Sequence, residues 1–504
     1  MSVSGLHARH PLGLVNSAEK ILWAAALVTL PVTSFRWFPF LGESTLVRPL
    51  SLYPLAILSP LLVFQAICQK RPFPRSGSMV LLGIFALAAL AVTVLGALID
   101  PIPLRGQDYF ERSLRGVVTL AIGLLFFLSA AWMNNDEADV RFTLRWLLVG
   151  LGLDLAWSGL QAVTFYTPLL RKEMVTHWQL AFSMRELVRT NRISGLAYEP
   201  AWLAGQIATI YLPVLFAAVM AGTRLTRARW LEPVLLTLTS LVLLATYSRG
   251  GLLIAIATAV ITLLLPGRDL LARSWRWFFG GIRAGWFVRL AMAAGALVMF
   301  TGIVLFLGQK NYFRRLWDLS ADNLSEYIVN INAGARSAYA SGAMAAFEEH
   351  PITGVGLGAS GFWIYQNLPD WALTTVPEIA RQLDPGSRLY PNPKNLYVRL
   401  LAETGLAGFV FFSIFLFSSL GQALDLTRRA GFSRFLGLAG FFAWLAIALY
   451  NVTQDSLTTP NIWLVPGILA GMGNILSPIA APKGPESRER FSDDSDSNTS
   501  TEIV

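Results

Sequence analysis

Long apolar stretches alternate with short polar connections over most of this chain. Runs of about 17 to 25 apolar residues suit a helix that crosses a bilayer. Read in this way, the sequence gives about twelve candidate spans, roughly 19–40, 46–67, 78–99, 114–133, 144–165, 200–222, 230–247, 250–266, 288–308, 399–420, 435–451 and 461–477. We therefore predict an all-α polytopic membrane protein.

The seventh and eighth stretches are the least secure as separate spans, because they could form one helical hairpin that turns at Tyr247-Ser-Arg-Gly-Gly. Arg249 stands in this turn with almost no polar cover on either side. Burying an unpaired guanidinium at membrane depth costs several kcal/mol, so this residue needs an anionic partner or a water-filled cavity. A multi-oxygen anion such as phosphate fits the guanidinium fork. Arg249 is therefore a candidate anion-binding residue.

The composition agrees with a membrane protein, since 54% of the 504 residues are hydrophobic and only 14% are charged. The net charge of +9 is carried almost wholly by arginine. A single cysteine, Cys68, excludes an intramolecular disulfide and a cysteine-ligated metal cluster. We expect no cleavable signal peptide, because the first apolar stretch continues to about Phe40 without a small-residue cleavage site.

The distribution of basic residues predicts the orientation. If residues 1–18 are cytoplasmic, every inside connection is basic, as the positive-inside rule requires; these connections hold Lys70, Arg71, Arg75, Arg141, Arg145, Arg224, Arg227, Arg229, Arg268, Arg273, Arg276, Arg283, Arg428, Arg429 and Arg434. The predicted organisation is then spans one to nine over 19–308, a periplasmic loop domain over 309–398, spans ten to twelve over 399–477, and a disordered cytoplasmic tail over 478–504.

Two outside loops are basic against this rule. They contain Arg171, Lys172, Arg185, Arg189 and Arg192 after the fifth span, and Lys310, Arg314, Arg315, Arg336, Arg381, Arg388 and Lys394 in the loop domain. One interpretation is that a long loop is translocated whatever its charge. The other is an extracytoplasmic anion site, since a connection of this length is usually functional.

The loop domain contains a predicted helix over 333–349, which is rich in alanine, has an apolar face that includes Ala338 and Met344, and is stopped by His350-Pro351. Arg336 falls in its first turn, where a cation opposes the helix dipole unless it shares an anion with the free amides. A solvated surface arginine is the alternative. The following Gly354-x-Gly-x-Gly358 is not preceded by a strand, so we expect flexible backbone packed near a substrate or the membrane rather than a nucleotide site.

Two carboxylates lie at the outer ends of predicted spans. Glu199 precedes Pro200, so it is either a capping carboxylate or a catalytic group. Glu403 is expected about two turns inside the tenth span, below Lys394 and Asn395 at its mouth.

These motifs, taken in order, resemble the signature set of the O-antigen ligase and Wzy-type polymerase superfamily: Arg192-x-x-Gly195, Thr246-x-Ser-Arg249-Gly, an Arg336 helix leading into His350-Pro-x-x-Gly-x-Gly-x-Gly, and Asn395-Leu-Tyr-x-x-Leu-x-Ala-Glu403-x-Gly405. The resemblance covers about residues 190–410. It implies a membrane glycosyltransferase with a GT-C-like fold and a large periplasmic loop between spans nine and ten. Its donor would be a glycan on undecaprenyl pyrophosphate.

In that family, arginines resembling Arg192, Arg249 and Arg336 bind the pyrophosphate or support catalysis, and no metal or other cofactor is needed. Ligases usually carry a histidine directly before the asparagine of the Asn-Leu-Tyr motif, where this chain has Lys394. Glu199-Pro200 after Arg192-x-x-Gly instead resembles the polymerase branch. Lys394 could be a pyrophosphate ligand or a base with a lowered pKa.

The resemblance favours a Wzy-like polymerase of the bacterial inner membrane that joins lipid-linked repeat units at the periplasmic face. We expect Glu199 to be the base, with Glu403 second and Lys394 third, and the arginines to stabilise the leaving pyrophosphate. Alternatives are a ligase that transfers the glycan to lipid A core or another acceptor, and a transporter or flippase. The expected partners are the lipid-linked oligosaccharide, a chain-length regulator and a flippase, with no nucleic acid.

Overall fold

The computed structural model describes residues 11–37, 46–68, 76–187, 190–276, 279, 285–309, 311–315, 321, 323–331, 333–384, 386–387 and 389–476. Over these residues the chain folds into helices and loops, with isolated β-bridges but no strand. This result agrees with the predicted all-α class. The predicted disordered tail and residues 1–10 of the predicted N-terminal segment lie outside the described residues.

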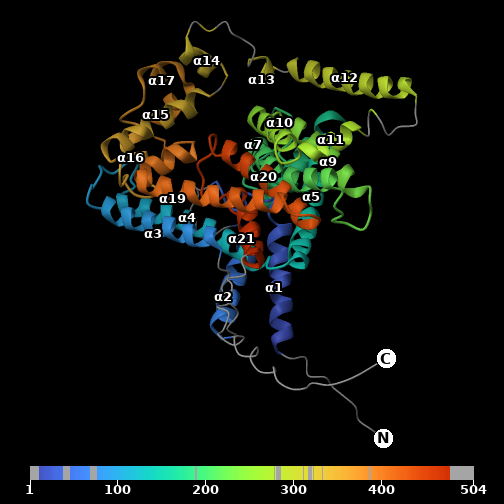
Figure 1. The fold of residues 1–504 in the computed structure, drawn as a ribbon. Coiled ribbons are helices and arrows are strands. Elements are labelled where there is room, and N and C mark those ends of the chain that lie inside the picture. Colours follow the sequence, from blue (N-terminus) through green and yellow to red (C-terminus); the bar gives the residue numbers. More distant parts are fainter. Residues whose placement is uncertain are drawn as a thin grey trace, which may run out of the picture.

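The helices follow one another as α1 (Pro11–Val28), α2 (Leu52–Cys68), α3 (Gly77–Gly96), α4 (Tyr109–Trp132), α5 (Glu137–Tyr166), α6 (Lys172–Phe182), α7 (Pro200–Gln206), the π-helical turn η1 (Ile207–Tyr211), α8 (Leu212–Ala221), α9 (Leu231–Ala245), α10 (Arg249–Leu264), α11 (Arg268–Arg276), α12 (Trp286–Gly308), α13 (Asn311–Arg314), α14 (Leu324–Asn330), α15 (Gly334–Glu349), α16 (Gly361–Ile364), α17 (Asp370–Thr375), α18 (Pro377–Leu383), α19 (Leu396–Thr427), α20 (Phe432–Tyr450), η3 (Pro460–Ile462) and α21 (Leu464–Leu476). Figure 1 shows their arrangement.

Each of the twelve predicted stretches overlaps a helix. By length and composition, six helices among the described residues can cross a membrane: α3, α4, α5, the continuous α7–η1–α8, α19 and α20. Shorter apolar helices include α2, α9 and α10. The protein is therefore polytopic, while the total of twelve spans stays a prediction. The α9–α10 pair consists of two helices joined by a turn of a few residues, with Arg249 at the first position of α10.

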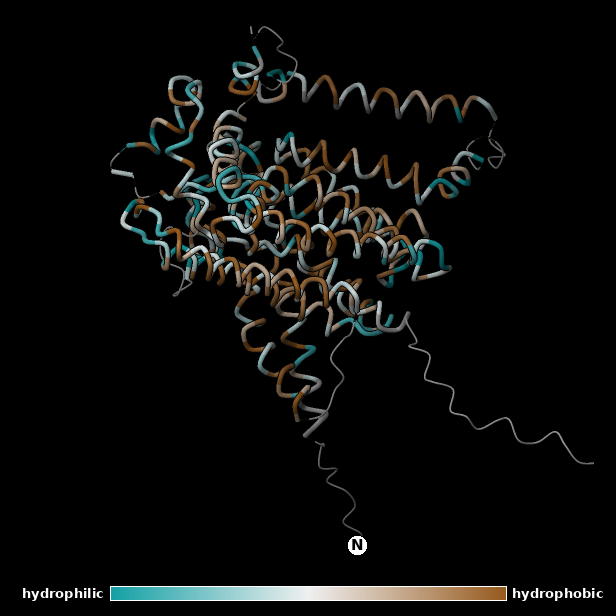
Figure 2. Tube along the Cα trace, turned by 60° about the vertical axis from the view of Figure 1, so that its left-hand side comes forward, coloured by the Kyte–Doolittle hydropathy of each residue, from teal (hydrophilic) through white to brown (hydrophobic). Residues whose placement is uncertain are grey.

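The core of the helix bundle is aromatic. Ring contacts join Phe127 of α4, Phe412 and Phe415 of α19, and Trp463, which lies between η3 and α21. Gly123 lets the indole of Trp463 approach the backbone of α4, because a β-carbon there would overlap the ring. Figure 2 shows hydrophobic residues along these helices and hydrophilic ones mainly in the connections. This packing fixes α4, α19 and α21 relative to one another.

One end of the bundle collects basic connections. Arg141 and Arg145 at the start of α5 donate hydrogen bonds to the carbonyls of Arg224 and Leu225, in the connection from α8 to α9. Arg434 on α20 pairs with Asp269 on α11. Four connections that the sequence places on the same side therefore contact one another in two pairs, while the alternation of the spans across the membrane stays a prediction.

Helices α14 to α18 belong to the predicted loop domain over 309–398. They lie beside the ends of α3, α4 and α19 that are far from the basic connections (Figure 1). The loop domain has a hydrophobic core of its own, to which Tyr339, Ile364 and Ile379 contribute. Arg105, in the connection from α3 to α4, donates hydrogen bonds of 2.8 Å to the carbonyls of Gln382 and Asp384. The loop domain is therefore fixed to the bundle.

One local expectation needs correction, and a second segment has a packing role that the sequence did not predict. The buried face of α15 consists mainly of small residues, with Gly342, Ala343 and Ala346 buried and Met344 only partly so, because α15 packs closely against α16 and α19. The glycines from Gly354 to Gly358 have positive φ angles and pack against α4 and the kink of α19 at Gly405. The backbone of this segment thus contacts helices of the protein itself.

Candidate functional site

Arg192 lies in an irregular segment, residues 190–199, which we call the strap. The strap begins at Thr190 and ends at Glu199, the N-cap residue of α7. The Nε of Arg192 donates a 2.8 Å hydrogen bond to the carbonyl of Thr246, and the amide of Ile193 donates to the carbonyl of Ala245. The start of the strap is therefore attached to the turn that carries Arg249.

Arg249 and Arg336 make the same kind of contact with two further segments. The guanidinium of Arg249 donates to the carbonyl of Ile331, just before α15. Arg336, in the first turn of α15 as predicted, donates to the carbonyl of Thr453 in the connection from α20 to η3. Each arginine thus joins its own segment to one that is distant in sequence.

Glu199 completes this arrangement. It occupies the N-cap position of α7, but its side chain makes no capping hydrogen bond. Its Oε2 pairs with Arg185 at 3.1 Å, so the capping role considered from the sequence is not the one observed. The ring of Tyr450, at the end of α20, packs against Gly205 of α7, because a β-carbon on that glycine would overlap it.

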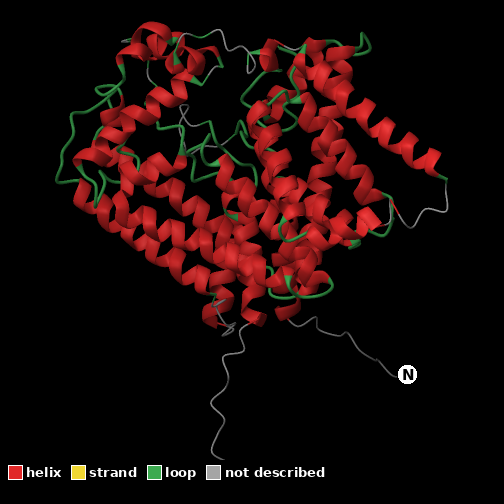
Figure 3. Ribbon diagram, turned by 45° about the horizontal axis from the view of Figure 1, so that its top comes forward, coloured by secondary structure: helices red, strands yellow, loops and turns green. Residues whose placement is uncertain are grey.

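These contacts link the strap to the α9–α10 turn, that turn to the chain just before α15, and the first turn of α15 to the α20–η3 connection, and Tyr450 packs against the helix that follows the strap. We call Arg192, Arg249, Arg336, Glu199 and Tyr450 the arginine ring. Figure 3 shows irregular segments gathered between groups of helices at the top of that view. The three predicted pyrophosphate ligands and the first-choice base therefore belong to one contiguous region, with a high density of positive charge.

Lys394 joins the region through its backbone. Its amide donates a 3.0 Å hydrogen bond to Asp455, which lies two residues beyond Thr453. The next residue, Asn395, caps α19 by accepting from the amides of Tyr397 and Val398. Lys394 is consequently held next to the arginine ring, at the mouth of α19.

Glu403 lies two turns inside α19, as predicted, but it is engaged in a buried network. Its carboxylate accepts from Arg399 at 2.9 Å and from the hydroxyl of Ser360 at 2.9 Å, and its side chain is only 3% exposed. Arg399 also donates to the carbonyl of Asp455. Among the described residues no direct contact joins Glu403 to the arginine ring, so the structure connects this carboxylate to it only through Arg399 and Asp455.

A cation and an aromatic ring border this network. The guanidinium carbon of Arg112 lies 3.6 Å from the ring centre of Tyr390, close enough for a cation–π interaction. Burial raises the pKa of Tyr390, so its phenol remains neutral. This contact between Arg112 and Tyr390 holds α4 against the segment that precedes α19.

The backbone is unusual at three places in the site. Asn191, Tyr247 and Lys394 have φ angles of 53°, 49° and 57°, which non-glycine residues rarely adopt. Each stands directly beside a motif of the arginine ring or of the α19 mouth. Such conformations cluster at functional sites because the surrounding contacts must hold them in place.

Sequence reasoning missed several residues of the site: Arg185 was noted only as a basic residue, and Tyr450, Asp455 and Arg399 were not considered. Arg399 stands four residues before Glu403, a spacing that places both on one helix face and could have indicated the pair. Asp455 is the only acidic residue between the last two predicted spans, which was also a readable signal.

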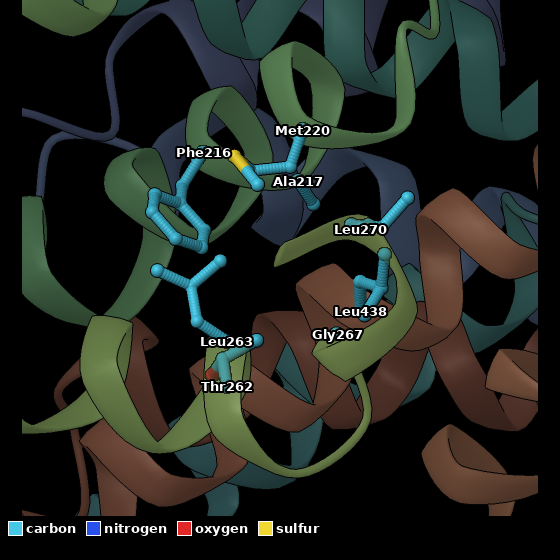
Figure 4. A pocket seen from close by; sticks show the side chains of 8 residues that line it. All are labelled: Phe216, Ala217, Met220, Thr262, Leu263, Gly267, Leu270 and Leu438. Atoms are coloured by element: carbon cyan, nitrogen blue, oxygen red, sulfur yellow. The ribbon is translucent and has the colours of Figure 1, made fainter. Parts of the chain in front are cut away.

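A separate apolar pocket lies between α8, α10, α11 and α20 (Figure 4); it is lined by Phe216, Ala217, Met220, Thr262, Leu263, Gly267, Leu270 and Leu438. None of these side chains carries a charge, so the pocket is not suited to a pyrophosphate. The described residues contain no group of three or more histidine, cysteine, aspartate or glutamate side chains that could hold a metal ion.

Residues 234–413 match the family model described as O-antigen ligase. The match runs from α9 into α19 and includes Arg249, Arg336, Lys394 and Glu403, whereas Arg192 and Glu199 precede it. It confirms the resemblance found in the motifs. Together with the apolar helices, it indicates a multi-pass membrane protein that contains a region similar to O-antigen ligases. A comparison with curated proteins finds no significant match.

Proposed function

Since residues 234–413 carry the O-antigen ligase domain, we propose that the protein is a Wzy-type polymerase of the bacterial inner membrane. It joins oligosaccharide repeat units carried on undecaprenyl pyrophosphate at the periplasmic face. The observation that carries this proposal is the arginine ring, which brings three guanidinium groups and a carboxylate from separate segments into one region.

The arginines suit a pyrophosphate leaving group. A guanidinium presents five N–H donors in a planar fork and can hold two phosphate oxygens at once. Preorganised cations stabilise the charge that develops on the leaving group without having to reorganise during the reaction. The leaving group therefore requires neither a general acid nor a metal ion in this scheme.

Glu199 is the proposed base. Arg185 engages its Oε2, and Oε1 has no hydrogen bond among the described residues, so one oxygen is available for a substrate hydroxyl. In the proposed step, the acceptor hydroxyl oxygen forms a bond to the anomeric carbon of the donor. The bond from that carbon to the pyrophosphate oxygen breaks, the pyrophosphate keeps the bonding electrons, and the hydroxyl proton passes to Glu199.

A ligase is the second candidate, because the matched family model is described as O-antigen ligase. It would use the same donor and the same arginines, and Lys394 would take the place of the base. A transporter is less well supported, since neither the match nor the arginine ring indicates transport. In a polymerase pathway, a flippase would supply the donor and a chain-length regulator would act on the product.

The two schemes are separated by Glu199→Gln and Lys394→Ala, with Glu173→Gln as a control for an exposed carboxylate on α6. The readout is the length distribution of lipid-linked glycan in cells. The polymerase predicts that single repeat units accumulate in Glu199→Gln, while long chains persist in Lys394→Ala and in the control. A null strain that accumulates long lipid-linked chains without transfer would refute the polymerase and support the ligase.

A further inference from the structure

Asp154 is a fully buried carboxylate on α5, well inside the segment that can cross the membrane. An ionisable residue at such a position is rare and demands a physical explanation. Gln161, also buried, follows seven residues later, two helical turns along the same face. Both side chains point to one neighbour, the strap.

The two side chains bind three consecutive backbone amides of the strap. Oδ1 of Asp154 accepts from the amide of Leu196 at 2.7 Å. Oε1 of Gln161 accepts from the amides of Ser194 and Gly195, both at 3.0 Å. The Nε2 of Gln161 also donates to the carbonyl of Gly195 at 3.1 Å. This pairing meets a strict requirement, because irregular backbone at membrane depth is tolerated only where the protein satisfies its hydrogen bonds.

Gly195 allows this close approach. Its φ angle is +56°, and a β-carbon at this position would overlap Oδ1 of Asp154. The strap therefore lies directly on α5, and the glycine of the Arg192-x-x-Gly195 motif has a packing role there. The motif glycine and Asp154 form one fitted contact.

The contact divides the strap into two parts. On the side of Arg192, two hydrogen bonds to the α9–α10 turn hold the backbone and the guanidinium, and the hydroxyl of Tyr166 at the end of α5 also donates to the carbonyl of Asn191. On the side of Glu199, the amide of Tyr198 donates to Thr33, and the carboxylate of Glu199 forms a partly exposed ion pair with Arg185. Because an exposed ion pair fixes a side chain less firmly than a bond to a main-chain carbonyl, Glu199 depends on the α5 contact more than Arg192 does.

Asp154 also faces the helix that Glu199 begins. Its helix, α5, packs against the π-helical turn η1, which contains Tyr211 and directly follows α7. Such turns often occur at functional sites. Asp154 therefore contacts the chain before Glu199 and lies near the helix after it.

We propose that Asp154 and Gln161 are positioning residues that form an internal clamp on residues 194–196 and thereby set the place of Glu199 in the arginine ring. This inference rests on the proposed function in assigning catalysis to Glu199. It assigns a role to α5, which lies outside the matched domain. The clamp controls turnover more than donor binding, because Arg192 has its own anchors.

The test compares Asp154→Leu, which removes the acceptor, with Asp154→Asn, which keeps an amide oxygen for the Leu196 N–H. Thr164→Val is the matched control, since this α5 hydroxyl bonds within its own helix. We expect Asp154→Leu to lower kcat by about 100-fold, the scale of a misplacement of about 1 Å. We expect the donor KM to change by less than about threefold in this variant, and Asp154→Asn to retain kcat within about threefold.

Hydrogen exchange of the purified full-length protein provides a second readout that does not depend on activity. The amides of residues 194–196 should exchange faster in Asp154→Leu and at the wild-type rate in Asp154→Asn and Thr164→Val. If Asp154→Leu does not fold, Gln161→Met tests the same clamp through the amides of Ser194 and Gly195. Unchanged exchange in these variants would overturn the clamp, whereas faster exchange with unchanged kcat would overturn its role in positioning Glu199.

The clamp and the proposed function fail in different ways. If Glu199→Gln leaves polymer formation unchanged, the assignment of the base is wrong, yet exchange at residues 194–196 still reports whether the clamp exists. If Glu199→Gln stops turnover but Asp154→Leu does not lower kcat, the base assignment stands and the positioning role is wrong.

Discussion

Replacing Arg336 with lysine tests the electrostatic reasoning directly. The change keeps the net charge but substitutes a point ammonium for a planar fork, which cannot hold two phosphate oxygens in the same way. Arg336 is exposed in the first turn of α15, so the substitution should leave the free energy of unfolding within about 0.5 kcal/mol of the wild type.

The expected loss is in catalysis. Removing one preorganised donor costs about 2 to 4 kcal/mol of transition-state stabilisation. At about 1.36 kcal/mol for each factor of ten, this corresponds to a fall of about 30- to 900-fold in kcat/KM. Arg336→Gln removes the cation altogether: the relief of an unfavourable charge in the first turn of α15 offsets part of the lost hydrogen bond to the Thr453 carbonyl. Activity should therefore fall far more than stability.

The assay measures the initial rate of chain extension with purified protein and lipid-linked repeat units, alongside the unfolding temperature of each variant. Arg381→Lys is the matched control, since Arg381 lies exposed in the last turn of α18 in the same loop domain. If Arg336→Lys retains kcat/KM within about threefold of the wild type at equal expression, Arg336 is not a pyrophosphate ligand.

Two further predictions concern stability and topology. Arg399→Met should lower the free energy of unfolding by about 3 to 5 kcal/mol, because it leaves the Glu403 carboxylate buried without its cation. The double variant with Glu403→Met should regain much of the lost stability. An unchanged unfolding temperature in the single variant would contradict the role of the pair. Topology is tested in a Cys68→Ser background with single cysteines at two exposed positions, Thr374→Cys in the loop domain and Ala430→Cys in the α19–α20 connection. An impermeant thiol reagent added outside the cell should label the first variant but not the second. The reverse labelling pattern would show that the predicted topology is inverted.

Local features of the sequence were predicted well. The helix predicted over 333–349 is observed as Gly334–Glu349, because alanine-rich composition and the His350-Pro351 stop act within the segment itself. The cap of α19 at Asn395 and the place of Glu403 two turns later follow from the same local signals. Helix propensity and capping need no knowledge of the tertiary structure.

Tertiary features could not be read in this way. The buried face of α15 depends on how closely α16 and α19 approach it, and small residues give no hydrophobic periodicity that would mark the face. The sequence places Glu403 near the mouth of a span as a second candidate base, whereas the structure pairs it with Arg399 and Ser360. The hydroxyl comes from a loop more than forty residues away in sequence, so spacing could not reveal it.

The arginine ring shows why one sequence reveals the donors of such a site but not the acceptors. Arg192, Arg249 and Arg336 reach partners 54, 82 and 117 residues away, and each partner is a main-chain carbonyl. Every residue has a carbonyl, so the side chain at the accepting position carries no signal of the contact. Under the proposed function, the donors, in contrast, must be arginine, because a pyrophosphate requires the fork geometry of the guanidinium. Substitutions at the accepting positions should therefore be tolerated wherever the backbone is kept, while substitutions of the arginines should not.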